Sequence, residues 1–269
     1  LMSRSPTPSA HPFHRHPATP WAELRVSQLS PHCFRLHAHD EYSIGIVDAG
    51  RAMFNHARGP EPVGAGSVIL MEPGCWHACN PEQLGHWAYR MLFVQADWVH
   101  AQLQTSQLRF GARALHTAAA RDAVNALCQP QALEGDTAAH TQLLLQSLRQ
   151  FGTPVETKEL PATDATEANA VHNALQQLHD QPDAGISVQT LASAAGMSAS
   201  RFIRHFKGAT GVTPGAYRLN LRINGARRLL AQGEGLANAA HRMGFADQAH
   251  MQRAFKAYHS LTPGSYARA

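Results

Sequence analysis

The amino-acid sequence predicts a two-domain α+β protein. A β-barrel with trailing helices precedes an all-α domain, which carries two helix-turn-helix units joined by a long helix. Three observations lead to this prediction. Short segments of alternating hydrophobicity fill the first third of the chain, amphipathic helical patterns fill residues 167–269, and one helical segment occurs twice. With 269 residues, 44% of them hydrophobic, the chain is long enough for two separate cores.

The composition favours a cytoplasmic protein. Residues 1–20 are polar and rich in proline and histidine, which predicts a disordered tail and not a signal peptide. No run of about 18 apolar residues occurs, so we expect no membrane span. The four cysteines are too few for a disulfide scaffold, which indicates a reducing compartment. They are Cys33, Cys75, Cys79 and Cys128.

Residues 21–151 are predicted to form the first domain. Between Ala22 and Phe93, six short segments alternate and are separated by turns with glycine or proline, as in an all-β barrel or sandwich. The segments are AELRVSQL, CFRLHAHD, YSIGIVDAG, RAMFNHA, SVILMEP and HWAYRMLFV. From Ala96 to Phe151 the pattern becomes helical, and Asp136 is the expected N-cap of the last helix.

An apolar stripe marks that last helix of the first domain. Leu144, Leu148 and Phe151 follow one another at helical spacing. Such a stripe packs either on the domain's own barrel or on a second subunit. A homodimer is therefore one hypothesis for this helix.

The charge changes sign along the chain, across a predicted linker at residues 152–166. Residues 1–166 hold 12 Lys and Arg against 14 Asp and Glu, whereas residues 167–269 hold 11 against 5, a net charge of +6. A basic helical domain is the electrostatic footprint of a protein that meets polyanions. A solvated helix face would give the same excess of basic residues, so charge alone does not show that the domain binds a polyanion.

The internal repeat lies in this basic half. Residues 198–219 align without a gap with residues 247–268, and seven of the 22 positions are identical, including Thr-Pro-Gly-x-Tyr. Each copy follows a short helix (residues 191–195 and 236–243) and a tight turn with glycine, and Ser198 or Asp247 is the expected cap of the next helix. Two copies are too few for a solenoid, so the repeat predicts two equivalent binding elements.

A long helix from Pro214 to about Gln232 joins the two units. Its roughly 19 residues span about 28 Å, close to the ~34 Å between successive major grooves on one side of B-DNA. The second helices of both units could then enter adjacent grooves. The expected buried stripe is Leu219, Ile223, Ala226 and Leu230, and the arginines expected to lie off it are Arg218, Arg222, Arg227 and Arg228.

Residues 187–266 resemble the AraC/XylS family of bacterial transcription regulators. The resemblance is carried by LASAAGMSASRFIRHFK, RLNLRINGARRLLAQG and LANAAHRMGFADQAHMQRAFKAYHSLTPGSY, in which the Gly-Phe-x-Asp-Gln turn and the closing Thr-Pro-Gly-x-Tyr are the most specific parts. It implies a sequence-specific DNA-binding regulator that recognises promoter DNA. Activation through RNA polymerase is the family expectation, with repression as the alternative.

The resemblance also places residues on DNA. The implied base-reading positions are Ala199, Ser200, Ile203 and Arg204 in the first unit, and Gln248, Ala249, His250, Gln252 and Arg253 in the second. Arginine can bond guanine in a bidentate manner and glutamine can bond adenine. Ser198, Lys207, Arg222 and Lys256 are better placed for phosphates. Phe202, Phe206, Met251 and Phe255 occupy the apolar positions.

The N-terminal half resembles the cupin-like effector-binding domain that often precedes this DNA-binding unit. LHAHDEYSIGIVDAGRAMF at 36–54 and GAGSVILMEPGCWHACNP at 64–81 carry the resemblance. The implied effector site consists of His37, His39, Glu41, Tyr42, Trp76, His77 and Tyr89. Arg35, Arg51 and Arg90 are candidates for its mouth or lining, and an arginine there would favour an effector with a carboxylate, for example an amino acid.

A metal is the alternative occupant of the barrel. His37 and His39 are two apart on an expected strand and point to one face. With Glu41 and His77 they form the set used by metal-binding cupins, which suits Zn, Fe, Mn or Ni. The glutamate comes earlier than in metal cupins, and relatives fused to this DNA-binding unit more often keep the barrel for a small organic effector. The resemblance therefore favours histidines that bind an effector or fill the barrel over a metal site.

Three functions follow from these patterns. The sequence favours a transcription regulator controlled by a small-molecule effector, with a metal-responsive regulator as the alternative. A metal-dependent cupin enzyme is a remote third, because an enzyme has no use for a doubled helix-turn-helix. We therefore expect no catalytic residues.

Overall fold

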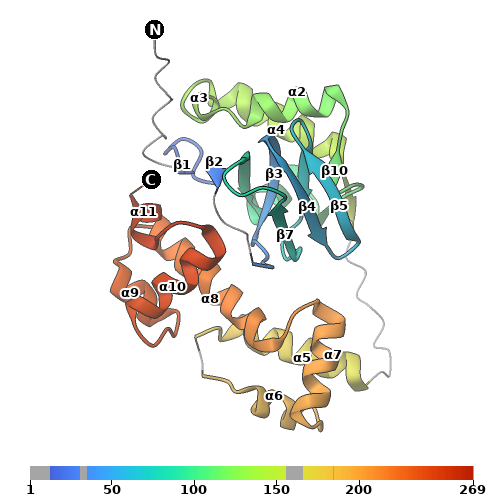
Figure 1. Ribbon diagram of the computed structural model, residues 1–269, viewed down its shortest axis with the longest axis vertical. Coiled ribbons are helices and arrows are strands. Elements are labelled where there is room, and N and C mark those ends of the chain that lie inside the picture. The colour runs from blue at the N-terminus through green and yellow to red at the C-terminus, as the bar shows by residue number, and fades with distance from the viewer. Residues whose placement is uncertain (1–12, 31–34, 156–165, 184, 269) are drawn as a thin grey trace. The chain divides into compact units, whose positions relative to one another are not determined.

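A computed structural model describes residues 13–30, 35–155, 166–183 and 185–268 (Figure 1). The chain divides into two compact units, with the division near residue 157. The first unit is rich in β-strands and the second is helical, so the predicted α+β class with a barrel and an all-α part is confirmed.

Antiparallel sheets form the first unit. The largest contains, in spatial order, β1 (Phe13–His14), β2 (Ala22–Ser30), β8 (Trp87–Gln95), β3 (Glu41–Ala49), β6 (Val68–Met71) and β10 (Ala114–Leu115). A second sheet contains β5 (Gly59–Gly64), β4 (Arg51–His56) and β7 (His77–Pro81). In addition, β9 (Gln107–Phe110) pairs with β11 (Gly152–Val155).

The six-stranded sheet has two buried faces. Along its strands, alternate residues such as Leu24, Ile44 and Leu92 point to a core shared with helices. These helices are α1 (Ala96–Leu103), α2 (Ala118–Leu127), α3 (Pro130–Glu134) and α4 (Thr137–Phe151). In Figure 1, α2, α3 and α4 lie together beside the barrel. The residues in between, such as Met91 and Phe93, face the barrel interior.

The apolar stripe of α4 packs inside its own unit. Leu144 and Leu148 are fully buried in the core between helices and sheet, and Phe151 packs against the same core. The Asp136 carboxylate accepts hydrogen bonds from the first backbone N–H groups of α4, as the sequence predicted. The stripe therefore gives no support to the homodimer hypothesis.

Several predicted boundaries in the first unit are wrong. The predicted strand at 33–40 is reduced to one bridge residue, His37, in its described part, because the chain turns there to place His37 beside His77. Residues 13–20 belong to the fold and not to a tail, since β1 pairs with β2 and Phe13 is buried; residues 1–12 lie outside the described part.

Long-range pairing explains the missed strands. β9 and β10 lie in the region predicted to be helical, and β11 lies in the predicted linker. Gly152 lets β11 lie directly over the side chain of Leu108 on β9, where an added Cβ would be only 2.6 Å from it. The rest of the predicted linker, residues 156–165, is outside the described residues.

The second unit contains the helices α5 (Thr166–Asp180), α6 (Val188–Ala194), α7 (Ala199–Thr210), α8 (Pro214–Ala231), α9 (Leu236–Arg242), α10 (Gln248–His259) and α11 (Pro263–Ala267). In Figure 1, α8 runs from the α5 to α7 group to the α9 to α11 group. The predicted caps are confirmed, because Ser198 accepts a hydrogen bond from the N–H of Arg201 and Asp247 accepts one from the N–H of His250. Among the described residues, no helix has the length and hydrophobicity needed to cross a membrane.

The turns of the two helix-turn-helix units have the same backbone structure. Gly196 and Gly244 end the first helix of each unit at φ values of +63° and +68°. The next residue, Met197 or Phe245, donates its N–H to a carbonyl five residues earlier, at 2.9 and 3.0 Å. The repeat in sequence is therefore also a repeat in local structure.

Three of the four α8 arginines that were expected to lie off the buried stripe make contacts within the helical unit. Arg222 donates to the carbonyl oxygens of Pro182 and Asp183 at 2.8 and 3.1 Å, and Arg218 donates to that of Ile186. Arg227 is buried, and its guanidinium lies 6.0 Å from the ring centre of Tyr266. Arg228 is exposed, as expected.

The predicted buried stripe of α8 also needs correction. Ile223, Ala226 and Leu230 are buried as predicted, but Leu219 is only half-buried. Asn220 and Asn224 are buried in addition. The buried surface of α8 is wider than one stripe because the helix carries contacts to both helix-turn-helix units.

Candidate effector cavity and DNA-reading helices

The barrel interior contains a cavity that opens to solvent. Strands of the six-stranded sheet, β7 of the second sheet and the segment before β3 form its wall. The lining consists of Arg25, His37, His39, Ile46, Val47, Ile69, Met71, His77, Cys79, Trp87, Tyr89, Met91 and Phe93. Seven of these are apolar side chains, and the described lining contains no Asp or Glu. The cavity therefore suits a small molecule with an apolar body.

Arg25 brings a permanent positive charge into this lining. The residue is only 6% exposed, and its guanidinium carbon lies 5.5 Å from the ring centres of both Phe13 and Tyr89. These are cation–π distances. Strand alternation places Arg25 on the face opposite Leu24 and Val26, which pack toward the helices.

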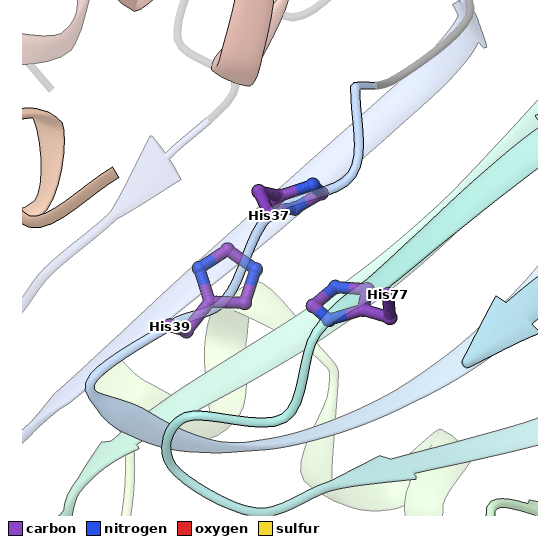
Figure 2. A group of neighbouring side chains, drawn as sticks. All are labelled: His37, His39 and His77. Atoms are coloured by element: carbon purple, nitrogen blue, oxygen red, sulfur yellow. The ribbon is translucent and has the colours of Figure 1, made fainter. Parts of the chain in front are cut away.

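Three histidines gather at the cavity wall. His37 and His39 precede β3 and His77 begins β7, and Figure 2 shows their rings turned toward a common centre. One nitrogen from each ring lies within 4.8 Å of the others, and all three side chains are buried. Backbone hydrogen bonds join His37 and His77 in both directions, at 3.0 and 2.8 Å. The fold thus fixes the imidazoles in one cluster.

Burial keeps three titratable side chains of the lining, those of His77, Cys79 and Tyr89, uncharged. Desolvation, helped by the neighbouring His37, holds the pKa of His77 well below its usual value. Burial raises the pKa of the Cys79 thiol to about 12 and also raises the pKa of Tyr89. At neutral pH, the side chains of His77, Cys79 and Tyr89 are therefore uncharged.

The structure brings only part of the predicted effector set to the cavity. His37, His39, His77 and Tyr89 line it, whereas Glu41, Tyr42 and Trp76 do not. Tyr42 points to the opposite face, where its hydroxyl accepts from the N–H of Leu108 at 2.9 Å and bonds His100. Glu41 begins β3 and lies outside the histidine cluster, so the predicted four-ligand metal set is wrong in this residue.

The arginine predictions for the cavity are also wrong. Arg90 lies outside it and bonds the Asp48 carboxylate and the Asn125 amide oxygen, both at 2.7 Å. Arg51 pairs with Glu82 at the surface, and Arg35 is exposed. Arg25 was missed, although its alternation with apolar neighbours was visible in the sequence.

In the first helix-turn-helix unit, the helix predicted to read DNA is α7. Phe202 and Phe206 hold it to the core. Ser200 and Arg204 are exposed, whereas Ala199 and Ile203 are half-buried. Lys207 lies exposed in the last turn, and Ser198 is the cap. Arg201 is exposed too, and the repeat aligns it with His250.

In the second helix-turn-helix unit, the helix predicted to read DNA is α10. Met251 and Phe255 are its buried anchors. The predicted readers that are exposed are Gln248, Ala249, Gln252 and Arg253, and Lys256 is also exposed. His250 is half-buried, with its ring edge-on to Phe245 at 5.4 Å between centres. Arg222, predicted to bind phosphate, instead uses its donors on the α5–α6 connection and is not retained in the phosphate set.

The fold and these sites define a class of protein. A barrel with a mainly apolar cavity is joined to a helical unit with two helix-turn-helix elements, which is the arrangement of a ligand-binding DNA regulator. A family model described as an AraC-like ligand binding domain matches residues 23–199, and one described as a helix-turn-helix domain matches residues 191–269. The chain belongs to the AraC family of DNA-binding transcription regulators, which are not enzymes.

Relatives agree with this assignment. YbfI, an uncharacterized HTH-type transcriptional regulator of Bacillus subtilis, is 24% identical over 247 residues, which cover 85% of this chain and 90% of YbfI. A putative AraC-like transcription regulator of Streptomyces antibioticus is 35% identical over 99 residues, 36% of this chain and 33% of its own length. An uncharacterized HTH-type transcriptional regulator of Haemophilus influenzae is 31% identical over 105 residues, and the match spans 35% of its length.

One solved structure resembles the whole chain. ToxT from Vibrio cholerae, in a structure with a bound unsaturated fatty acid, superposes with a TM-score of 0.57. The match covers 91% of this chain and 94% of ToxT at 12% sequence identity. This likeness shows that the two proteins share a fold.

Proposed function

We propose that a small organic anion binds in the barrel cavity and changes how the helical unit binds promoter DNA. The observation that carries this proposal is the buried guanidinium of Arg25 in an otherwise mainly apolar cavity of the ligand-binding domain. A ligand controls such a protein only if it prefers one of two arrangements of the chain. The effector would then shift the population between operator-competent and incompetent states.

The lining narrows the chemical class of this effector. The apolar wall favours a hydrocarbon or aromatic body, and Arg25 favours a carboxylate or a similar anion that can accept two hydrogen bonds. An amino acid, the example suggested by the sequence, fits less well, because the described lining offers no Asp or Glu for its ammonium group. The fatty acid in the ToxT structure is a molecule of the favoured class.

We propose that α7 and α10 read the operator. Arg204 and Arg253 occupy equivalent exposed positions and are assigned to guanine, and Gln248 and Gln252 are assigned to adenine. Lys207 and Lys256, with the cap Ser198, are assigned to phosphates, where they fix the register of the protein. Action as an activator through RNA polymerase belongs to this proposal on the strength of the family resemblance alone.

Two measurements on the full chain test the proposal. A thermal-shift screen against fatty, aromatic and amino acids should detect a ligand, because a compound at 100 times its Kd stabilises by about 2.7 kcal/mol. Selection from random duplex DNA then yields an operator, and fluorescence anisotropy compares its affinity with and without the ligand. An anionic ligand that stabilises the protein and changes operator affinity is the expected result.

The outcomes separate the rival functions. A ligand that binds without changing operator affinity would contradict effector control. Zn²⁺ or Ni²⁺ that changes operator affinity with no organic ligand would favour the metal-responsive regulator. Failure of the selection to enrich any sequence would contradict sequence-specific recognition itself.

A further inference from the structure

We propose that His37, His39 and His77 bind one divalent first-row transition-metal ion, with at least one coordination position open to the cavity. The three rings come from two segments about 40 residues apart in sequence, yet one nitrogen of each lies within 4.8 Å of the others. All three side chains are buried and line the same cavity. This site goes beyond the proposed effector control, because the ion can bind whether or not an organic effector is present.

The outer nitrogens of two rings have the contacts that metal-binding histidines need. Nδ1 of His37 lies 2.6 Å from the carbonyl oxygen of Arg35, and Nδ1 of His77 lies 2.8 Å from that of Cys75. A carbonyl oxygen can only accept, so Nδ1 carries the proton in both rings. This leaves the Nε2 lone pairs as ligands. A histidine that ligates a metal commonly donates its other N–H to such a carbonyl.

The backbone fixes the positions of all three residues. The reciprocal hydrogen bonds between His37 and His77 form an isolated antiparallel bridge between two otherwise separate segments. The carbonyl of His39 accepts a hydrogen bond from the N–H of Gly74 at 2.8 Å, which ties it to the same loop. Phe93 packs edge-on against the His39 ring at 4.8 Å. A site held this way loses little entropy when an ion binds.

The dimensions fit an ion after a small adjustment. Ligand nitrogens at about 2.0–2.1 Å from a tetrahedral Zn²⁺ lie roughly 3.4 Å apart. From separations of 4.8 Å or less, each pair of nitrogens needs to approach by no more than about 1.4 Å, which side-chain rotation can supply. Imidazole ligands suit Zn²⁺, Ni²⁺, Cu²⁺ and Fe²⁺.

No carboxylate completes the set within the described residues. Glu72 lies on the loop before His77, but its oxygens bond the N–H of Phe110 and the guanidinium of Arg113. Glu41 is outside the cluster. Three neutral imidazoles leave the ion with its full positive charge and with a fourth position for water or an anion. Because the same rings line the cavity, that position faces the space in which an anionic ligand would lie.

Cobalt binding tests the proposal on the full chain, prepared without an affinity tag and stripped with a chelator. Titration with Co²⁺ alone should give a saturable visible absorption spectrum at one equivalent. Azide, added as a small anionic ligand, should change that spectrum if a coordination position is open. Replacement of one ligand, in His77→Gln or His39→Gln, should weaken binding at least tenfold, since loss of an outer partner alone costs about 10–100-fold.

His116→Gln is the matched control, because the His116 side chain is 58% exposed and lies outside the cluster. It should keep the wild-type stoichiometry and spectrum. Thermal unfolding identifies any variant that fails to fold, and the other ligand variant then replaces it. Absence of saturable binding to the wild type, or equal loss in His116→Gln, would overturn the site. A spectrum that azide leaves unchanged would overturn the open position. None of these readouts involves DNA, so they stand apart from the test of effector control.

Discussion

The two equivalent turn glycines provide a matched pair for testing the helical unit. Gly196 and Gly244 both have left-handed φ values, so alanine at either position costs about 1–2 kcal/mol in backbone energy. Their surroundings differ. A Cβ at Gly196 would meet nothing within 4 Å, whereas a Cβ at Gly244 would lie 2.4 Å from the carbonyl oxygen of Asp183.

This contact gives the expected difference between the two variants. The Asp183 carbonyl is held in place by Arg222, so it cannot move away freely. Forcing a methyl group into such a packed position costs a further ~1–3 kcal/mol. We therefore expect a loss of about 1–2 kcal/mol for Gly196→Ala and about 2–5 kcal/mol for Gly244→Ala.

Thermal unfolding of the full chain measures both losses. For a domain of this size, 1 kcal/mol shifts Tm by about 4–8 °C. The transition of the helical unit is the one that added duplex DNA raises, because a ligand stabilises only the unit that binds it. Gly244→Ala should lower this transition at least ~4 °C further than Gly196→Ala. Equal shifts in both variants would refute the reasoning, because they would mean that the Asp183 contact carries no energy.

Three further predictions concern the sites. Arg253→Ala should weaken binding to the selected operator by about 1–3 kcal/mol and relax the sequence preference at one base position. Lys256→Ala should weaken binding to every DNA sequence alike and reduce the salt dependence of binding. Fluorescence anisotropy measures both variants, and equal effects would contradict these roles. Arg25→Met should weaken the anionic ligand about 10–100-fold in thermal-shift titrations, because a charged hydrogen bond contributes roughly 1.5–3 kcal/mol; unchanged affinity would remove Arg25 from the site. Burial lowers the pKa of His140 below 6.5, so the unfolded chain binds a proton at this residue at a higher pH than the folded chain does. The free energy of unfolding of the barrel unit should therefore fall as pH drops below 6.5. In urea unfolding, His140→Gln should reduce this pH dependence, and an unchanged pH dependence would contradict the prediction.

The sequence by itself determined the features that depend on neighbouring residues. The caps Ser198 and Asp247, the glycine turns and the apolar anchors of α7 and α10 are local signals, and the structure has all of them where the sequence placed them. The repeat strengthened each signal, because every feature could be checked against its copy. The repeat also aligns the exposed Arg201 of α7 with His250 of α10, which was among the predicted base-reading residues.

Only the tertiary structure decided which face of each strand meets the cavity. Tyr42 and Arg25 both lie on strands of the six-stranded sheet, but the helices cover the face with Tyr42 and leave Arg25 in the barrel interior. Alternation separates two faces and cannot say which of them the helices will cover. That choice depends on contacts between segments far apart in sequence, because the shared core runs from Ala22 on β2 to Leu148 on α4. For the same reason, Arg222 on α8 was predicted from the sequence to bind phosphate, whereas its guanidinium donates to the backbone carbonyls of Pro182 and Asp183 within the same unit.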